Sequence, residues 1–356
     1  MERNLEKAID SIISECQECG LCSSSCDLLA GHESPAEMAR RGITMEEGYT
    51  CALCGRCKAV CPFDLSPMDM FQARRDEAIQ NQEQDPDEFN YFMPDSEENV
   101  MNKYRQYYNI DYSDLGSDEN SDTYFFPGCT FMTYSPKLTK EVYNRLRKEI
   151  GCREILTDCC GNPFYQMGLS DSAHQFSNSL IDKIVQKEVK RLIVACPNCF
   201  YRLRETLKST GVEISTIYEV LDFSGITSGK LTKCTIHDSC PDRFEGILAQ
   251  QTRDTLKSCG YEIKEMTNIR ENSPCCGSGG QIAHFQPDLA DKLVKGRLEE
   301  ANSTGTEMLV SYCLSCTLNF SRFDSKLKRR HVLNLLLGVD EDYTEVNNQL
   351  NEVFAE

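Results

Sequence analysis

The stretch LTDCCGNPF at residues 156–164 places two cysteines side by side, Cys159 and Cys160, and follows them with a glycine. The same Cys-Cys-Gly triplet returns in NSPCCGSGG at residues 272–280. Adjacent cysteines rarely bridge to each other, because a disulfide needs a specific Cα separation and torsion. Each triplet therefore indicates a bound group that needs two sulfur atoms at one point.

Each triplet belongs to a set of five cysteines in the same order: a lone cysteine, the adjacent pair, and a C-x2-C motif. The first set is Cys129, Cys159, Cys160, Cys196 and Cys199, and the second is Cys240, Cys275, Cys276, Cys313 and Cys316. Five thiolates exceed the four ligands of a tetrahedral zinc ion. Soft thiolate ligands favour iron–sulfur chemistry, so each set indicates a group with several irons.

Eight further cysteines form two runs with the spacing C-x2-C-x2-C-x3-C. The runs are Cys16, Cys19, Cys22 and Cys26, then Cys51, Cys54, Cys57 and Cys61. This spacing is typical of bacterial ferredoxins with two [4Fe–4S] clusters, in which the fourth cysteine of each run binds the other cluster. We therefore assign Cys61 to the first-run cubane and Cys26 to the second-run cubane. A pair of zinc sites is the alternative, although zinc sites rarely place two quartets in this register. Between the runs, Ser34, Pro35 and Glu37 predict a capped helix.

Apolar stretches alternate with helical stretches after residue 122, and the order occurs twice. TYFFPGC, RLIVACPNC, KCTIHDSC and EMLVSYCLSC each place a cysteine motif directly after a strand-like stretch. The alternation predicts an α/β fold with a mainly parallel sheet in each half. Ligands of such sheets bind at the carboxyl ends of the strands. The predicted domains are a helical ferredoxin domain at 1–80, an acidic linker at 81–121, and repeated α/β domains at 122–228 and 229–356.

The composition limits the compartment and the partners. The net charge is −18 among 356 residues, and nucleic-acid binding would need a basic surface, so no nucleic-acid partner is expected. The N-terminal MERNLEKAID is too polar for a secretory signal, and the apolar run VLNLLLGV is too short to cross a membrane. We expect a cytoplasmic protein without a transmembrane segment, peripheral to the membrane at most through a partner. Residues 62–122 hold 16 acidic and 4 basic residues. We interpret the acidic linker as a solvated tether, with a partner-docking segment as the alternative.

Together, the ferredoxin runs, FFPGC, HDSC, CCGSGG and both C-x2-C motifs resemble the heterodisulfide reductase family. The order of domains is similar to that of its fused catalytic subunit, and also to the glycolate oxidase iron–sulfur subunit. The resemblance covers nearly the whole chain, the acidic linker being the least typical part. It implies a noncubane [4Fe–4S] cluster on each five-cysteine set, beside the two cubanes. Structural zinc in one half is an alternative, and a thioredoxin-like C-x2-C is a weaker one.

Other residues receive smaller roles. Cys152, Cys234 and Cys259 follow no ligand spacing and are expected to be structural. His237 lies three residues before Cys240 and would tune a cluster or deliver a proton, unless it only hydrogen-bonds within its loop. Asp238 is interpreted as a turn residue. Arg243 and Arg253 are interpreted as surface charges, and Gly279 and Gly280 as a close backbone approach to a cluster.

Two functions fit this sequence. In the first, the chain is a heterodisulfide-reductase-like oxidoreductase subunit that accepts electrons through the cubanes and reduces a disulfide at a noncubane cluster. The expected site is in the second half, with the catalytic residues Cys240, Cys275, Cys276, Cys313, Cys316 and His237. In the second, the chain is an electron relay between a flavoprotein dehydrogenase and a quinone or ferredoxin acceptor. No flavin or nicotinamide motif is present, so a flavoprotein subunit or a ferredoxin would donate the electrons, with a membrane cytochrome as a further possible partner.

Overall fold

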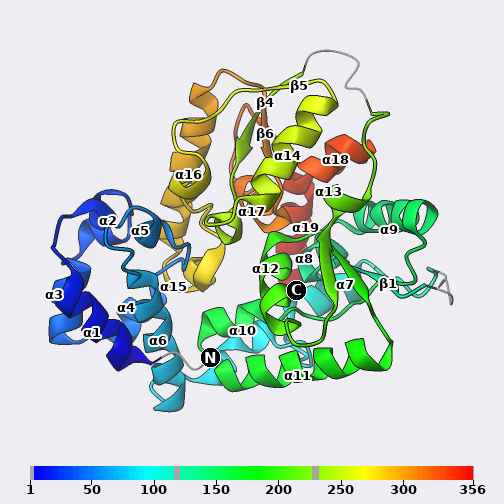
Figure 1. Ribbon diagram of the computed structural model, residues 1–356. Coiled ribbons are helices and arrows are strands. Elements are labelled where there is room, and N and C mark those ends of the chain that lie inside the picture. Colours follow the sequence, from blue (N-terminus) through cyan, green and yellow to red (C-terminus); the bar gives the residue numbers. More distant parts are fainter. Residues whose placement is uncertain (1–3, 116–120, 227–231, 356) are drawn as a thin grey trace.

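The computed structural model describes residues 4–115, 121–226 and 232–355 (Figure 1). The first part is all-helical and gathers at one side of the molecule. Its helices are α1 (Leu5–Glu15), α2 (Leu21–Ser24), α3 (Pro35–Arg41), α4 (Met45–Tyr49), α5 (Arg56–Ala59) and α6 (Pro67–Gln80), with the 3-10 turn η1 (Leu29–Gly31). Helix α3 begins as predicted, because the Ser34 and Glu37 side chains cap it in a reciprocal capping box.

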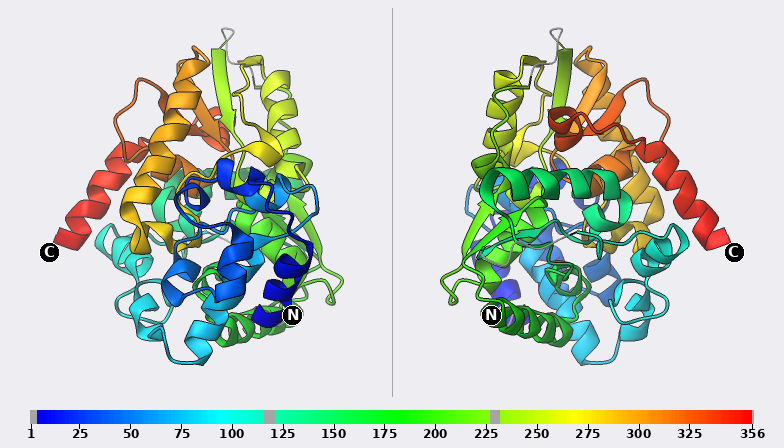
Figure 2. Two further views of the ribbon diagram at one scale, coloured as in Figure 1. Left: turned by 90° about the vertical axis from the view of Figure 1, so that its left-hand side faces the viewer. Right: turned by 90° about the vertical axis from the view of Figure 1, so that its right-hand side faces the viewer.

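The acidic segment after α6 packs against the rest of the protein. It contains η2 (Pro86–Phe92) and α7 (Val100–Tyr107). Phe89 is fully buried, with its ring 5.9 Å from that of Tyr49. Tyr104 is also buried, and its hydroxyl donates to Gln349 on the C-terminal helix α19 (Tyr343–Ala355), which lies beside this segment (Figure 2). The interpretation of the 81–121 linker as a solvated tether is therefore wrong for residues 81–115, because aromatic side chains anchor this part; residues 116–120 lie outside the described residues.

The first α/β half contains a parallel sheet with the order β1-β2-β3. Its strands are β1 (Thr123–Phe126), β2 (Arg191–Val194) and β3 (Glu213–Thr216). Its helices are α8 (Cys129–Tyr134), α9 (Pro136–Ile150), α10 (Asn162–Met167), α11 (Ser170–Gln186), α12 (Pro197–Thr206) and α13 (Ile217–Val220). Ile155 adds a single parallel bridge to Phe125 on the other side of β1.

The second half repeats this topology in a parallel sheet with the order β5-β4-β6-β7. Its strands are β4 (Thr232–His237), β5 (Tyr261–Ile263), β6 (Met308–Ser311) and β7 (Lys328–His331). The other elements are η3 (Cys240–Asp242), α14 (Ile247–Ser258), η4 (Arg270–Asn272), η5 (Gly279–Gln281), α15 (Ile282–Phe285), α16 (Pro287–Ser303), α17 (Leu314–Phe320) and α18 (Val332–Leu337). The bridge at Ile155 occupies the place of β5, so the two halves share one strand order.

One hydrophobic core runs through both sheets. It includes Phe125 and Val194 from the first half, and Ile236 and Val310 from the second. Because the sheets share this core, the carboxyl ends of β1, β2, β4 and β6 are held in a constant relation to one another. The α/β prediction is confirmed, with both sheets wholly parallel in the described residues. No helix in the described ranges is long and apolar enough to cross a membrane.

Candidate functional site

The two ferredoxin-like runs have the same loop geometry. The first cysteine of each run accepts a backbone N–H from the residue two positions later: Glu18 to Cys16 Sγ at 3.4 Å, and Leu53 to Cys51 Sγ at 3.3 Å. Both donor residues have positive φ, 50° and 51°, which turns the N–H back onto the sulfur. Hydrogen bonds of this kind favour a thiolate, the form that binds iron.

The eight cysteines of the runs divide between two cavities. One cavity is lined by Cys16, Cys19, Cys22 and Cys61, and the other by Cys26, Cys51 and Cys54, while Cys57 borders both. The fourth cysteine of each run therefore lies with the other run. This placement is the one that the crossed assignment of Cys61 and Cys26 requires, and the ligation itself stays a prediction.

The glycine of each Cys-Cys-Gly triplet shapes the sulfur site. Gly161 and Gly277 both adopt left-handed backbone conformations, with φ of 79° and 77°. This conformation lets the glycine N–H donate to the first sulfur of its own pair, at 3.3 Å in both halves. A Cβ on Gly277 would lie 2.6 Å from the carbonyl oxygen of Ala290. Only glycine fits here, because any side chain would be strained and would meet backbone.

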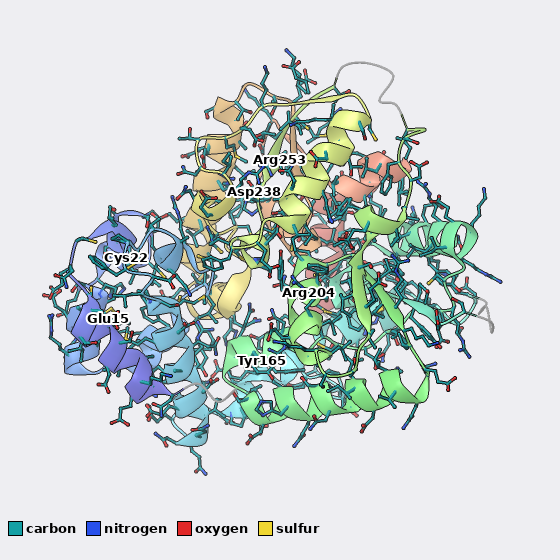
Figure 3. The ribbon with its side chains drawn as sticks, in the orientation of Figure 1. Glu15, Cys22, Tyr165, Arg204, Asp238 and Arg253 are labelled. Carbon is teal, nitrogen blue, oxygen red and sulfur yellow. The ribbon has the colours of Figure 1, made fainter. Side chains whose placement is uncertain are left out.

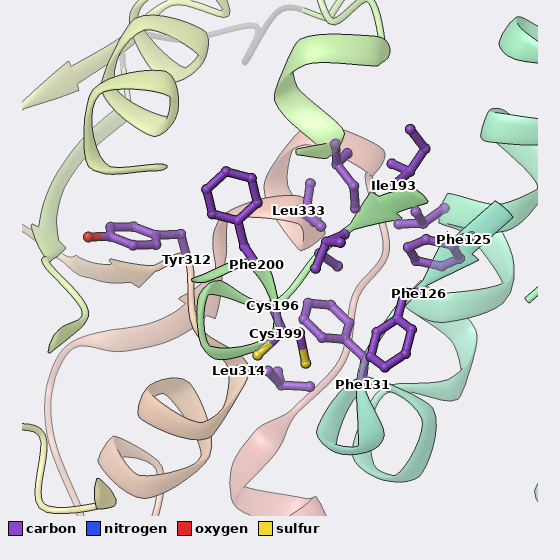
Figure 4. Close-up of a cluster of buried hydrophobic side chains, with 14 of the residues drawn as sticks. Phe125, Phe126, Phe131, Ile193, Cys196, Cys199, Phe200, Tyr312, Leu314 and Leu333 are labelled. Atoms are coloured by element: carbon purple, nitrogen blue, oxygen red, sulfur yellow. The ribbon is translucent and has the colours of Figure 1, made fainter. Parts of the chain in front are cut away.

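Both C-x2-C motifs lie where a strand passes into a helix. Cys196 follows β2 and caps α12, which carries Cys199 in its first turn. Cys313 follows β6 and caps α17, which carries Cys316 in the same position. In Figure 4 the Cys196 and Cys199 sulfurs lie together at the edge of the aromatic core, close to Leu314 of the second half.

The two five-cysteine sets face one cavity of about 140 Å³. Its wall contains eight of the ten cysteines: Cys129, Cys160, Cys196 and Cys199 from the first set, and Cys240, Cys276, Cys313 and Cys316 from the second. The Cys196 and Cys313 side chains lie close together across the boundary between the halves, near enough for Cys196 to lower the pKa of Cys313. The Thr130 and Ser315 hydroxyls also meet there, at 3.4 Å. The second half alone was the expected site, whereas the structure brings both sets together.

The pKa of the second cysteine of each adjacent pair shifts in the same direction in the two halves. Hydrogen bonds from the Cys159 and Cys199 thiols hold the pKa of Cys160 well below its usual range, although burial opposes them. In the second half, hydrogen bonds from the Cys275 and Cys316 thiols likewise hold the pKa of Cys276 well below its usual range. By contrast, burial raises the pKa of Cys129 to about 11. In the second half the pKa of Cys313 is lowered as well, by hydrogen bonds from the Cys196 and Cys316 thiols, so the first set holds one sulfur of low pKa and the second set two.

His237 is fully enclosed beside the second set. One ring nitrogen of His237, the Cys276 sulfur and the Cys316 sulfur all lie within 4.8 Å of one another. Arg297 Nε donates to His237 Nδ1 at 3.1 Å. Because a guanidinium only donates, Nδ1 is the acceptor and the neutral ring carries its proton on Nε2. That N–H is available to the Cys276 sulfur, which favours a tuning role for His237 over proton delivery from solvent.

The ferredoxin-like part touches the second set directly. The Cys54 side chain of the second run lies close to the Cys275 side chain of the adjacent pair, near enough to raise the pKa of Cys54. Backbone contact accompanies this approach, since a Cβ on Gly279 would lie 2.6 Å from the Ala52 carbonyl oxygen. A Cβ on Gly280 would overlap the Cys51 carbonyl oxygen. These two glycines therefore admit the backbone of the second run, and the interpretation that they only approach a cluster is incomplete.

Two buried arginines hold this interface together. Arg75 of α6 donates to the carbonyl oxygens of Cys51 at 2.6 Å and Gly280 at 2.9 Å. Arg243 reaches in the opposite direction, from the second half to the carbonyl oxygen of Cys54 at 2.8 Å. Its Nη2 donates to the Ser273 carbonyl oxygen, also at 2.8 Å. Arg243 is 5% exposed, so its interpretation as a surface charge is wrong.

Several other residues stabilise the fold around the site. Asp238 and Arg253 form a buried ion pair at 2.7 Å, and both are labelled above the centre of Figure 3. Burial alone would raise the pKa of Asp238, but the hydrogen bonds and charge of Arg253 outweigh it and lower that pKa. Arg253 is thus no surface charge, and Asp238 is more than a turn residue. The three remaining cysteines, Cys152, Cys234 and Cys259, are fully buried in the hydrophobic core, as expected of structural residues.

Sequence reasoning missed Arg75 and Arg297. Arg75 lies in PMDMFQARRDEAIQ, where it has the same local setting as Arg74 and nothing marks it as buried. Arg297 lies in α16, about sixty residues after the histidine that it contacts. The available signal was a long basic side chain at a core-facing helix position, which a single sequence cannot distinguish from a solvated one.

Comparisons with known proteins agree with this organisation. A family model described as a 4Fe-4S dicluster domain matches residues 15–66. A second model, described as a cysteine-rich domain, matches twice, at residues 123–204 and 234–321. Together these matches indicate iron–sulfur clusters, and the sulfur-only donor sets of both regions suit them.

The chain is similar to components of methanogen reductases. It is 25% identical over 375 residues to a component of the fumarate reductase (CoM/CoB) of Methanothermobacter marburgensis, covering 93% of this chain and 72% of that protein. It is 22% identical over 324 residues to a component of the dihydromethanophenazine:CoB–CoM heterodisulfide reductase of Methanosarcina barkeri, covering 83% and 76%. It also spans 63% of the length of an uncharacterized iron–sulfur protein of Methanocaldococcus jannaschii, at 24% identity over 83% of this chain.

A bacterial protein is similar over a shorter region. Lactate utilization protein A 1 of Bacillus cereus is 24% identical over 226 residues, which cover 58% of this chain and 93% of that protein. The chain therefore combines a 4Fe-4S dicluster domain with two cysteine-rich domains, and it is similar to a component of a heterodisulfide reductase.

Proposed function

We propose that this chain is the disulfide-reducing subunit of an oxidoreductase complex. The observation that carries the proposal is the single cavity between the two five-cysteine sets. A disulfide has two sulfur atoms, and a cavity walled by two similar sulfur-rich sites offers each of them its own site. The reaction is RSSR′ + 2 e⁻ + 2 H⁺ → RSH + R′SH, so it needs two electrons and two protons.

The proposed ligands follow the placement of the cysteines. Cys16, Cys19, Cys22 and Cys61 would hold one cubane, and Cys51, Cys54, Cys57 and Cys26 the other. Each five-cysteine set would hold a noncubane [4Fe–4S] cluster, with zinc in one half as the alternative. Such clusters supply one-electron steps when bound. His237 would donate its Nε2 proton to the Cys276 sulfur and so stabilise negative charge there.

The route of the electrons follows from the interface. Cys19 is exposed at the outer side of the helical part, so the first run is the accessible entry for a donor. The second run then leads to the second half, because the Cys54 and Cys275 thiols are in contact. The proposed donor is a flavoprotein subunit or a ferredoxin, with a membrane cytochrome as another partner. The relatives named as parts of reductases support a place in such a complex.

The second candidate is an electron relay without a substrate of its own. The similarity to lactate utilization protein A favours it, because that protein matches over 93% of its length. In this function the chain would pass electrons from a flavoprotein dehydrogenase to a quinone or a ferredoxin.

One experiment separates the two functions. The cluster-loaded protein is reduced anaerobically with dithionite, freed of excess reductant, and mixed with 2-hydroxyethyl disulfide or with a soluble quinone. Disulfide reduction predicts one mercaptoethanol pair for every two electrons lost from the protein, and Cys276→Ser should abolish it. Rapid oxidation by the quinone without any thiol formed, in wild type and variant alike, would refute the reductase proposal and support the relay.

A further inference from the structure

The acidic segment brings a cation to the first cysteine set. Its helix α7 carries Arg105, which is half-buried. Arg105 Nη1 donates to the hydroxyl of Thr133 on α8 at 2.6 Å. Thr133 is fully buried and lies four residues after Cys129 in the same helix, so the two side chains share one face of α8. The guanidinium therefore lies beside the lone cysteine of the first set.

Further hydrogen bonds fix the place of this cation. Asn102, one turn earlier in α7, accepts from Arg105 Nη2 with its side-chain oxygen. The amide nitrogen of Asn102 donates in turn to the Pro94 carbonyl oxygen at 2.7 Å. Where the segment leaves α7, the Tyr112 hydroxyl donates to the Met132 carbonyl oxygen of α8, also at 2.7 Å. The acidic segment thus holds Arg105 in a defined position against α8.

The charge of Arg105 is not paired with a carboxylate. No ion pair of Arg105 occurs among the residues that the structure describes. Asp111 and Glu154 line the same surface cleft, but Asp111 accepts hydrogen bonds within its own turn and Glu154 pairs with Lys187. Burial lowers the pKa of Arg105, and the Cys129 sulfur is the strongest charge that opposes this effect. The positive charge therefore acts on a sulfur of the first set.

A cation beside a cluster ligand changes the potential of the cluster. Reduction adds one negative charge, and a nearby positive charge stabilises the reduced state. Arg202 of α12 adds a second cation at this set, since its charge reinforces the hydrogen bonds that lower the pKa of Cys160. In the second set, by contrast, the donor described above is the neutral ring of His237.

We propose that Arg105 raises the midpoint potential of the cluster on the first set, so that electrons pass to it from the second set. In that step one electron leaves the second set and reduces the first, and no bond is made or broken. The inference rests on the cluster proposed for the first set, and it holds whether the final acceptor is a disulfide or a quinone. It gives the acidic segment a role as the carrier of a positioning residue for this cluster.

The test is a redox titration of the cluster-loaded full chain, followed by electron paramagnetic resonance. The first-set signal is the one that Cys160→Ser alters. Arg105→Gln should make reduction of this cluster about tenfold less favourable, which is a fall of about 60 mV in its midpoint potential. Arg105→Lys keeps the charge and should restore most of the wild-type potential. Lys103→Gln is the matched control, because it removes one positive charge from an exposed position of the same helix and should leave the potential unchanged.

A second variant tests the charge without removing the arginine. Asn102→Asp keeps the oxygen that accepts from Arg105 but adds a compensating negative charge, so it should also lower the first-set potential. Unchanged potentials in Arg105→Gln and Asn102→Asp, with full iron content, would overturn the inference and leave the proposed function intact. An equal fall in Lys103→Gln would overturn it as well, because any surface charge would then suffice. If Cys160→Ser removes neither iron nor a signal, the cluster proposed for the first set is refuted together with this role of Arg105.

Discussion

Replacing Arg75 should loosen the contact between the ferredoxin-like part and both α/β halves. Its guanidinium donates to four backbone oxygens, those of Gly48, Cys51, Gln166 and Gly280, at 2.6–2.9 Å. The side chain is fully buried. Three parts of the chain therefore meet at one cation: the second run, the helix after the first triplet, and the loop after the second triplet.

The expected magnitude follows from this bonding. A hydrogen bond that involves a charged group is worth about 1.5–3 kcal/mol. Arg75→Lys keeps the charge but has three donors from a single nitrogen, so it should lose one or two of these bonds, or about 1.5–6 kcal/mol. Arg75→Met leaves four buried oxygens without a donor and should cost more. Burial raises the pKa of Cys51 to about 12 against the charge of Arg75, so this cation also favours negative sulfur beside it.

Two measurements separate positioning from charge. Hydrogen exchange should rise at α10 and η5 in both variants, because Gln166 and Gly280 lose their donor. The midpoint potential of the second-run cubane should fall only in Arg75→Met, on the order of 60 mV for a tenfold change in a one-electron equilibrium. Arg74→Lys is the matched control, since Arg74 bonds to Ile43 within the same part. Unchanged exchange at α10 and η5 in the Arg75 variants, or an equal rise in the control, would contradict this reasoning.

Three further predictions concern the clusters. Anaerobically purified protein should contain about 16 iron atoms, four in each of four clusters; near eight irons with one or two zinc ions would contradict the noncubane assignment. Cys61→Ser should alter the spectrum of the first-run cubane and spare the second, and the reverse result would contradict the crossed ligation. His237→Phe should lower the midpoint potential of the second-half cluster, because the N–H donor to Cys276 is lost. The reciprocal Phe126→His change, at the matching position of β1, provides the control. An unchanged midpoint potential of the second-half cluster in His237→Phe would exclude the tuning role.

Local signals predicted much of the fold. The parallel sheets, the cysteine motifs at strand ends and the helix after Ser34 all follow from patterns within about ten residues. The strands that escaped prediction, β3 and β7, lie at sheet edges. Strand β7 reads Lys-Arg-Arg-His, and edge strands tolerate such charged residues because one side faces solvent. The first half has no counterpart of β5 beyond the single bridge at Ile155 among the described residues.

The meeting of the two cysteine sets could not be predicted in this way. It depends on how the two halves share a core, which the spacing of cysteines does not encode. The burial of Arg75, Arg243 and Arg253 has the same origin, since each side chain finds its partners in segments distant in sequence. The acidic segment did carry a usable signal. Aromatic residues such as Phe89 and Tyr104 are rare in solvated tethers, because such tethers lack apolar groups to bury.

The repeat explains why the proposed site is symmetric, while the interface explains why its two sides differ. Both halves present four matching sulfurs to the cavity, but the second run touches only the pair of the second half, through Cys54 and Cys275. His237 also belongs to the second half alone, where the first half has Phe126. Electrons would therefore reach the second set first, and this set is the one with the additional hydrogen-bond donor, His237. The first set would receive them across the boundary where Cys196 meets Cys313. Under the proposed function, each set would supply one of the two electrons that the reduction of one disulfide needs.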